Sequence, residues 1–128
     1  MKLNFLIFFA FILTGCNSIN YNKEDFTIAA ENGKLANESF VRSLNCVKAW
    51  MGNRDSASGL IPSNLMGKKD LWEPFNAGAD NYAFMVLTSY LLDKDLYNGP
   101  MLDMLNSERK LTSRIKSLPD VYRFSTRS

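Results

Sequence analysis

The sequence predicts an all-α protein, and three observations lead to that class. Apolar residues recur at helical spacing in three segments, glycine and proline gather between those segments, and no stretch alternates apolar and polar residues as a half-buried strand would. We expect helices at residues 38–53, 78–93 and 100–119. A chain of 128 residues is long enough for one small domain.

Residues 1–15 have the arrangement of a secretory signal peptide. Lys2 is followed by an unbroken apolar run over residues 5–13. The run is too short to cross a bilayer as a helix, which needs about 20 apolar residues. A basic start, a short apolar core and small residues at its end are typical of a signal that is cleaved.

The motif LTGC at residues 13–16 resembles the lipobox of bacterial lipoproteins. The resemblance implies cleavage before Cys16 and a lipid on its thiol, so that the mature chain is anchored to a membrane. Asn17 stands where the inner-membrane retention signal of that family is aspartate, which implies the outer membrane of the cell envelope. An ordinary signal peptide with an incidental cysteine is the alternative. Residues 16–37 show little periodicity and are expected to form a tether.

The composition argues against several classes of protein. Histidine is absent and the chain has two cysteines, which excludes a Cys/His zinc site and a Ser-His-Asp triad. No metal or cofactor is expected. The formal net charge is +2 with no dominant basic patch, which argues against nucleic acid as a partner. Cys46 is interpreted as a small buried residue, with pairing to another chain as the alternative.

The first helix is expected at residues 38–53. One of its faces carries apolar residues at spacings of four, three and four, namely Phe40, Leu44, Val47 and Met51. Asn37 suits the N-cap and Gly52 suits the end of this helix.

Residues 52–77 are expected to form a long but ordered loop. Glycine and proline recur through it without any sustained period. Its apolar residues are too many for a free linker, namely Leu60, Ile61, Leu65, Leu71, Trp72 and Phe75. Loops of this length are commonly functional when they are ordered.

The second helix, residues 78–93, is expected to be buried on every side, because residues 82–87 leave no polar stripe. The third is expected to begin at Pro100, which suits the first position of a helix, and to run toward Pro119. Two neighbouring helices cannot surround the second one. We therefore expect residues 38–128 to be the helical N-terminal fragment of a larger protein.

Polar and aromatic residues gather where the loop meets the second helix. The segment WEPFNAGADNY at residues 72–82 and the pair at residues 54–55 supply the candidates, which are Trp72, Asn76, Asp80, Tyr82, Arg54 and Asp55. Aromatic faces stack on the C–H faces of sugars, and carboxylate, amide and guanidinium groups pair with sugar hydroxyls. The cluster therefore suits an oligosaccharide.

These segments resemble the first hairpins of six-hairpin (α/α) toroid proteins, the glycosidase-like and polysaccharide-lyase-like group. The resemblance covers residues 38–122 and implies an inner ring of apolar helices with a sugar-binding cleft at one end. Glycoside hydrolysis usually needs two carboxyl groups. Asp80 and Asp55 are the pair considered as catalytic, with Glu73 as a substitute, while Trp72, Asn76, Tyr82 and Arg54 are expected to bind substrate.

Each candidate also has a structural interpretation. Asp80 is interpreted alternatively as a carboxylate at a helix end, and Asn76 as an N-cap. Trp72 also suits a core or loop anchor, and Arg54 and Asp55 suit a surface ion pair. Two functions stay open: an envelope lipoprotein that binds or cleaves oligosaccharide, and a non-enzymatic helical lipoprotein that binds a partner protein.

Overall fold

The computed structural model of the protein describes residues 22–67, 69–114 and 118–128. The predicted signal peptide, residues 1–15, and Cys16 lie outside the described residues. The chain divides into two units, Met1–Leu35 and Ala36–Ser128. About two-thirds of the described residues are helical, which confirms the all-α prediction.

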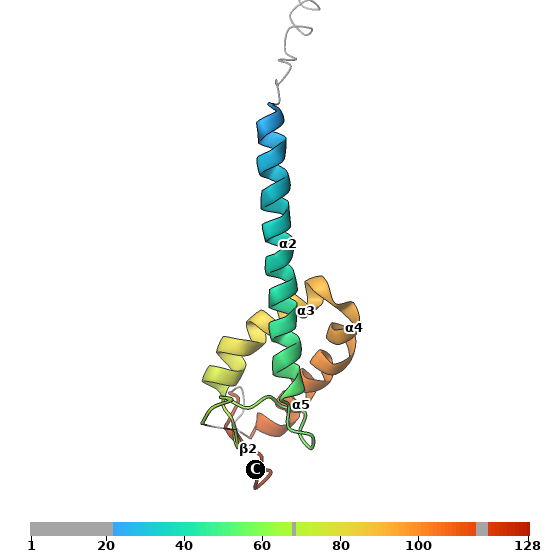
Figure 1. The fold of residues 1–128 in the computed structure, drawn as a ribbon. Helices are drawn as coiled ribbons and strands as arrows, with labels where there is room; N and C mark the ends of the chain where they lie inside the picture. The colour runs from blue at the N-terminus through green and yellow to red at the C-terminus, as the bar shows by residue number, and fades with distance from the viewer. Residues whose placement is uncertain (1–21, 68, 115–117) are drawn as a thin grey trace, which may run out of the picture. The chain divides into compact units, whose positions relative to one another are not determined.

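The elements follow one another as shown in Figure 1. The helices are α2 (Lys23–Gly52), α3 (Ala83–Leu92), α4 (Lys94–Leu96) and α5 (Leu102–Thr112), with π-helical segments η1 (Pro74–Tyr82) and η2 (Tyr97–Met101). The strands are β1 (Leu71–Trp72) and β2 (Tyr122–Arg123).

Helix α2 ends at Gly52 as predicted but begins at Lys23, so the start expected at Glu38 is wrong. Asn22 caps it, because its Oδ1 accepts the Glu24 N–H while Asp25 accepts the Asn22 N–H, both over 3.3 Å. Sequence periodicity missed this part because residues 22–42 are all exposed and so carry no buried stripe. Asn37 lies inside the helix and is no N-cap.

The C-terminal end of α2 supplies the buried part of the predicted apolar stripe. Val47 and Met51 are buried and Leu44 is half-buried, while Phe40 is exposed. Cys46 is also exposed, so the interpretation of its thiol as buried is wrong. The prediction of one apolar face therefore holds for the last two turns of the helix.

The loop after α2 is ordered, as predicted. The Asp55 carboxylate accepts hydrogen bonds from the Ser58 N–H and hydroxyl, both over 2.7 Å. Gly59 has a φ of 76°, a left-handed conformation that glycine adopts without strain. This turn directs Leu60 and Ile61 into the core, where both are fully buried.

The second predicted helix is observed as η1 followed by α3, and it begins at Pro74 instead of residue 78. Glu73 occupies the N-cap position, so the interpretation of Asn76 as N-cap is wrong. The expectation of burial on every side is also wrong. Helix α3 buries Met85, Thr88 and Ser89 and leaves its opposite face exposed.

The third helical run begins at Lys94, earlier than predicted. The Asp93 carboxylate caps it by accepting the Leu96 N–H over 3.0 Å. Pro100 lies within η2 and does not start the run. Helix α5 then ends at Thr112, short of Pro119.

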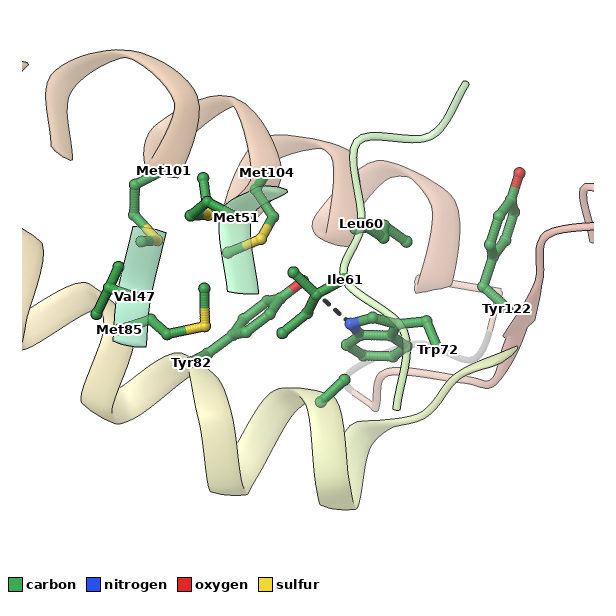
Figure 2. Close-up of a cluster of buried hydrophobic side chains, with 11 residues drawn as sticks. Val47, Met51, Leu60, Ile61, Trp72, Tyr82, Met85, Met101, Met104 and Tyr122 are labelled. Carbon is green, nitrogen blue, oxygen red and sulfur yellow. Dashed lines mark hydrogen bonds between the residues drawn. The ribbon is translucent and has the colours of Figure 1, made fainter. Parts of the chain in front are cut away.

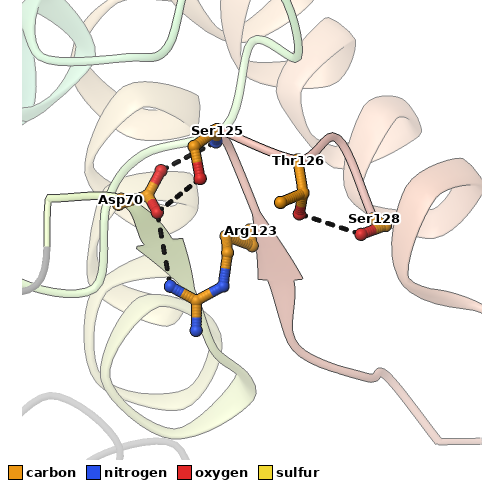
Figure 3. A network of polar contacts seen from close by, with 5 residues as sticks. All are labelled: Asp70, Arg123, Ser125, Thr126 and Ser128. Carbon is orange, nitrogen blue, oxygen red and sulfur yellow. Dashed lines mark hydrogen bonds and ion pairs between the residues drawn. The ribbon is translucent and has the colours of Figure 1, made fainter.

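Two short strands were not predicted. They pair antiparallel, with Leu71 opposite Arg123 and Trp72 opposite Tyr122. Next to them, the Asp70 carboxylate accepts hydrogen bonds from the Ser125 N–H and hydroxyl, both over 2.7 Å, and pairs with Arg123 (Figure 3). Strands of two residues are too short to show alternation, which explains why the sequence did not reveal them.

The core lies between the end of α2, the loop, η1, α3 and α5. Figure 2 shows Tyr82 between a group of methionines and Trp72. The fully buried large side chains include Trp72, Leu60, Ile61, Met85, Met101, Met104 and Val47. Within the described ranges, no helix is both long and apolar enough to cross a membrane.

Candidate functional site

Trp72 and Tyr82, both predicted to bind sugar, belong to the core. Trp72 is fully buried and Tyr82 is 7% exposed. The Trp72 Nε1–H donates to the Tyr82 hydroxyl over 3.0 Å (Figure 2). Burial also raises the pKa of the Tyr82 hydroxyl. Trp72 therefore has no exposed face on which a sugar ring can stack, and the interpretation as a core anchor describes it.

Arg54 and Asp55 have structural partners of their own. Arg54 donates from Nε to the Met51 carbonyl over 2.9 Å and from Nη1 to the Pro100 carbonyl over 3.3 Å, which ties the end of α2 to η2. Burial opposes ionisation of Asp55, but hydrogen bonds from Ser58 outweigh it and lower the pKa of that carboxyl. Both residues line a hollow of about 420 Å³ beside Gly59.

A second, smaller pocket brings together two of the predicted residues, Asn76 and Asp80. It has a volume of about 300 Å³ and lies between the end of α2, the loop and η1. Its lining residues are Trp50, Ser63, Asn64, Leu65, Asn76, Asp80 and Asn81. We refer to it as the polar pocket. Asp55 does not line it, so this pocket lacks the expected pair of carboxylates.

Ser63 is the most informative residue of the polar pocket. Its side chain is 4% exposed, and its Oγ is a buried polar atom without a hydrogen-bond partner in the part of the chain that the structure describes. Its backbone N–H is already used, since it donates to the Leu71 carbonyl over 2.7 Å. A buried hydroxyl normally has a hydrogen-bond partner, and water or a bound ligand can provide one.

Asn64 and Asn81, two of the three asparagines of the pocket, keep donors and acceptors that no described residue occupies. Asn64 uses its Oδ1 to accept the N–H groups of Met66 and Gly67, over 2.6 and 3.1 Å, which leaves its amide N–H groups. Asn81 uses its Nδ2 to donate to the Asn76 carbonyl over 2.6 Å, which leaves its Oδ1. Side-chain amides that offer both kinds of group match neutral hydroxyl-rich ligands.

Asp80 supplies the carboxylate of the polar pocket. It lies near the C-terminal end of η1 and not at the N-terminus of a helix. Its side chain is exposed, and among the described residues it has no hydrogen-bond or ion-pair partner. Glu73, the substitute carboxylate, accepts a hydrogen bond from the Asn76 amide and is not among the residues that line the pocket.

The π-helical geometry of η1 places these side chains together. In a π-helix, hydrogen bonds join residues five apart, as in the bond from the Gly78 N–H to the Glu73 carbonyl over 3.3 Å. Asn76 and Asn81 share that spacing and are linked by a side-chain hydrogen bond. Segments of this kind are rare and occur frequently at functional sites.

Sequence analysis missed Trp50 and Ser63. Trp50 is half-buried and lines the polar pocket, although its position in the sequence does not set it apart from the apolar face of the first helix. Ser63 carries no signal in the sequence, because only the folded loop shows that its hydroxyl is buried. Across the described ranges, no cluster of three or more acidic or cysteine side chains is placed to hold a metal ion.

Comparison of the chain with protein-family models, curated proteins and solved structures finds no match.

Proposed function

We propose that this protein is a lipid-anchored component of the bacterial cell envelope that binds an oligosaccharide in the polar pocket. The observation that carries the proposal is Ser63, which lines the pocket and whose buried hydroxyl lacks a partner among the described residues. Asn64, Asn81 and Asp80 line the same pocket and keep hydrogen-bonding groups that no described residue occupies. A sugar, with several hydroxyls that both donate and accept, satisfies such a set better than an apolar ligand does.

Trp50 adds an aromatic surface to this pocket. It is half-buried, so part of its ring system remains accessible while the rest packs against the core. Sugars place their C–H faces against aromatic rings, and a ring fixed by packing loses little conformational entropy when a ligand binds. Trp50 therefore replaces Trp72 as the stacking residue of the proposal.

The proposal is binding and not cleavage. Hydrolysis of a glycosidic bond usually requires two carboxyl groups on opposite sides of the bond, about 5–10 Å apart. Asp80 lines the polar pocket, but Asp55 lines a different hollow and uses its carboxylate to hold the loop. A binding role does not require a second carboxylate in the pocket.

The membrane anchor is proposed from the LTGC motif at residues 13–16. A lipid on Cys16 would hold the folded part at the outer membrane, where envelope polysaccharides are present. Stable anchoring needs more than one acyl chain, which the lipoprotein modification would supply. No part of this proposal depends on a helix that spans the membrane.

The finer architecture is also a proposal. We propose that the helices form the opening hairpins of a six-hairpin (α/α) toroid, with α3 as an inner helix. The support is the sequence of α3, which is apolar on all sides although it buries one side among the described residues.

A glycan array tests the function. The full chain, labelled and purified in mild detergent, should retain oligosaccharides from the bacterial envelope. Asp80→Asn should weaken that retention, because it removes the charge and keeps the shape. Asp103→Asn, an exposed acidic residue on α5, is the matched control and should bind like the wild type. No retention of any glycan by the wild type, or equal retention by Asp80→Asn, would contradict the proposal.

A second candidate function is the binding of a partner protein, and a separate observation favours it. Helix α3 exposes large apolar side chains at Phe84, Leu87 and Leu91, which are 39%, 60% and 62% exposed. Contiguous apolar surface of this kind marks interaction sites in soluble domains.

A further inference from the structure

The exposed side of α3 combines a ridge and a groove. The ridge consists of Phe84, Leu87, Tyr90 and Leu91, which lie within one side of the helix and are each 39–62% exposed. The groove beside it has a volume of about 500 Å³ and is lined almost entirely by apolar atoms of Tyr82, Ala83, Val86, Leu87, Tyr90, Tyr97 and Leu105. It shares no lining residue with the polar pocket.

We propose that this face binds a second copy of the chain, with the α3 ridge of each copy seated in the groove of the other. The proposal deepens the second candidate function by naming the partner, and it is independent of carbohydrate binding. Symmetric dimers require a self-complementary patch. Helix α3 meets that requirement because one face carries both the projecting side chains and the groove that fits them.

The distribution of charge favours a second copy over a lipid surface. From residue 81 to residue 92 the chain has no charged residue, so two ridges can meet without like charges at their centre. The residues at the ends of this stretch are acidic, namely Asp80, Asp93 and Asp95. Two cations lie nearby: Lys48 pairs with Asp93 over 2.9 Å, and Lys94 lies 3.3 Å from the centre of the Tyr90 ring. The acidic residues still outnumber these two cations, so the ends of the stretch do not attract anionic lipids.

The available area suits a weak dimer. A large aromatic or aliphatic side chain has about 200 Å² of surface, so the exposed fractions of the four ridge residues amount to roughly 400 Å² per copy. With the groove walls, two copies would bury about 1,000 Å², the lower limit for a specific interface. Anchoring in one membrane would bring the copies to a high effective concentration.

Ala83 and Leu87 define how the two copies meet. Ala83 is small and exposed, so it allows a partner backbone to approach the groove closely. Leu87 and Tyr90 each belong to both the ridge and the groove wall, and Leu87 is the more exposed of the two, at 60% against 47%. In a two-fold arrangement a residue with both roles lies near the axis, where it meets its own counterpart. Position 87 is therefore the best point for a cross-link.

Cysteine cross-linking in cells tests this geometry with the full chain. Cys46 is exposed and is first changed to serine. In that background, Leu87→Cys should give a disulfide-linked species of twice the chain mass under mild oxidation. Met66→Cys is the control, because Met66 is 94% exposed and lies outside this face. Equal dimer yields from the two variants, or no dimer from Leu87→Cys, would overturn the proposal.

The same experiment separates the second copy from other occupants. A Leu87→Cys product containing a different protein would reject the second copy while leaving the partner-binding function intact. Sedimentation of the purified full chain provides an independent measurement. Leu87→Lys should weaken self-association at least tenfold without lowering the melting temperature, because residue 87 is 60% exposed and is not part of the core. Unchanged association would overturn the proposal.

Discussion

The Trp72 indole N–H donates a hydrogen bond to the Tyr82 hydroxyl over 3.0 Å within the core. Trp72 lies in β1 and Tyr82 is the last residue of η1, so the bond joins the loop to the start of α3. The two rings are tilted by 55° with their centres 6.3 Å apart. A polar contact of this kind fixes the relative position of two elements that would otherwise meet only through apolar surface.

Tyr82→Phe should destabilise the protein by about 1–3 kcal/mol, because it leaves the buried Trp72 N–H without an acceptor. Urea unfolding followed by circular dichroism measures this change. Tyr90→Phe is the control, since Tyr90 is 47% exposed and its hydroxyl is accessible to water. Equal stabilities of the two variants would show that the Trp72–Tyr82 bond contributes little.

Ser63→Ala should leave the unfolding free energy of the empty protein unchanged or slightly increased. The Ser63 hydroxyl has no partner among the described residues, so its removal eliminates a desolvated polar group and loses no hydrogen bond within that part of the chain. Urea unfolding of the two proteins measures the difference. A loss of more than about 1 kcal/mol would indicate that the hydroxyl is bonded within the empty protein.

Glu108→Gln should raise the melting temperature at pH 7. Burial raises the pKa of Glu108 in α5, although a hydrogen bond from the Thr112 hydroxyl partly offsets that effect. Because the pKa of Glu108 is higher in the folded state, its contribution to the stability of the fold is fully present below the unfolded pKa of 4.5. That contribution is lost as the pH rises through the folded-state pKa. The difference between variant and wild type should therefore shrink at pH 4. Melts at both pH values test this.

Asp70→Asn should lower the melting temperature at neutral pH. The hydrogen bond from the Ser125 hydroxyl, followed by that from the Ser125 N–H, lowers the pKa of the Asp70 carboxyl (Figure 3). The contribution of Asp70 to the stability of the fold is therefore present above the unfolded pKa of 3.8. It is lost as the pH falls through the lower folded-state pKa. The two melting curves should converge in strong acid. Asp103→Asn should follow the wild type throughout.

Cys16→Ser should block both lipidation and removal of the signal peptide. The LTGC motif motivates this, since the thiol is the group that accepts the lipid in proteins with that motif. Labelled fatty acid incorporation and membrane fractionation of the full chain measure the two effects. A variant that matures and fractionates like the wild type would exclude Cys16 as the anchor.

The sequence predicted the elements whose apolar residues face the core. Apolar periodicity and the positions of glycine and proline predicted the end of α2 at Gly52. They also predicted the ordered loop, which buries Leu60 and Ile61. It did not predict the first half of α2, because a helix without a buried face has no apolar period. Nor did it predict the start at Lys94, where the cap depends on how Asp93 turns the chain.

For the candidate site, sequence reasoning found the segment that contains it. It did not separate the residues that belong to the core from those that line the polar pocket. Residues 72–82 contain both, and residue type alone does not tell them apart. Trp72 and Tyr82 bond to each other in the core, whereas Asn76 and Asp80 line the polar pocket. The segment Pro74–Tyr82 is π-helical, whereas an α-helix was expected only from residue 78. The proposed role of Ser63 could be found only from the burial of its hydroxyl in the folded protein.

A calorimetric titration tests the central claim most directly. The full chain is titrated with the oligosaccharide that the array selects, alongside Ser63→Ala and the control Ser43→Ala, a serine of α2 outside the polar pocket. The wild type and Ser43→Ala should bind equally. Ser63→Ala should bind about fivefold more weakly, as expected for one lost hydrogen bond. Equal affinities of Ser63→Ala and the wild type would contradict the assignment of the polar pocket as the sugar-binding site.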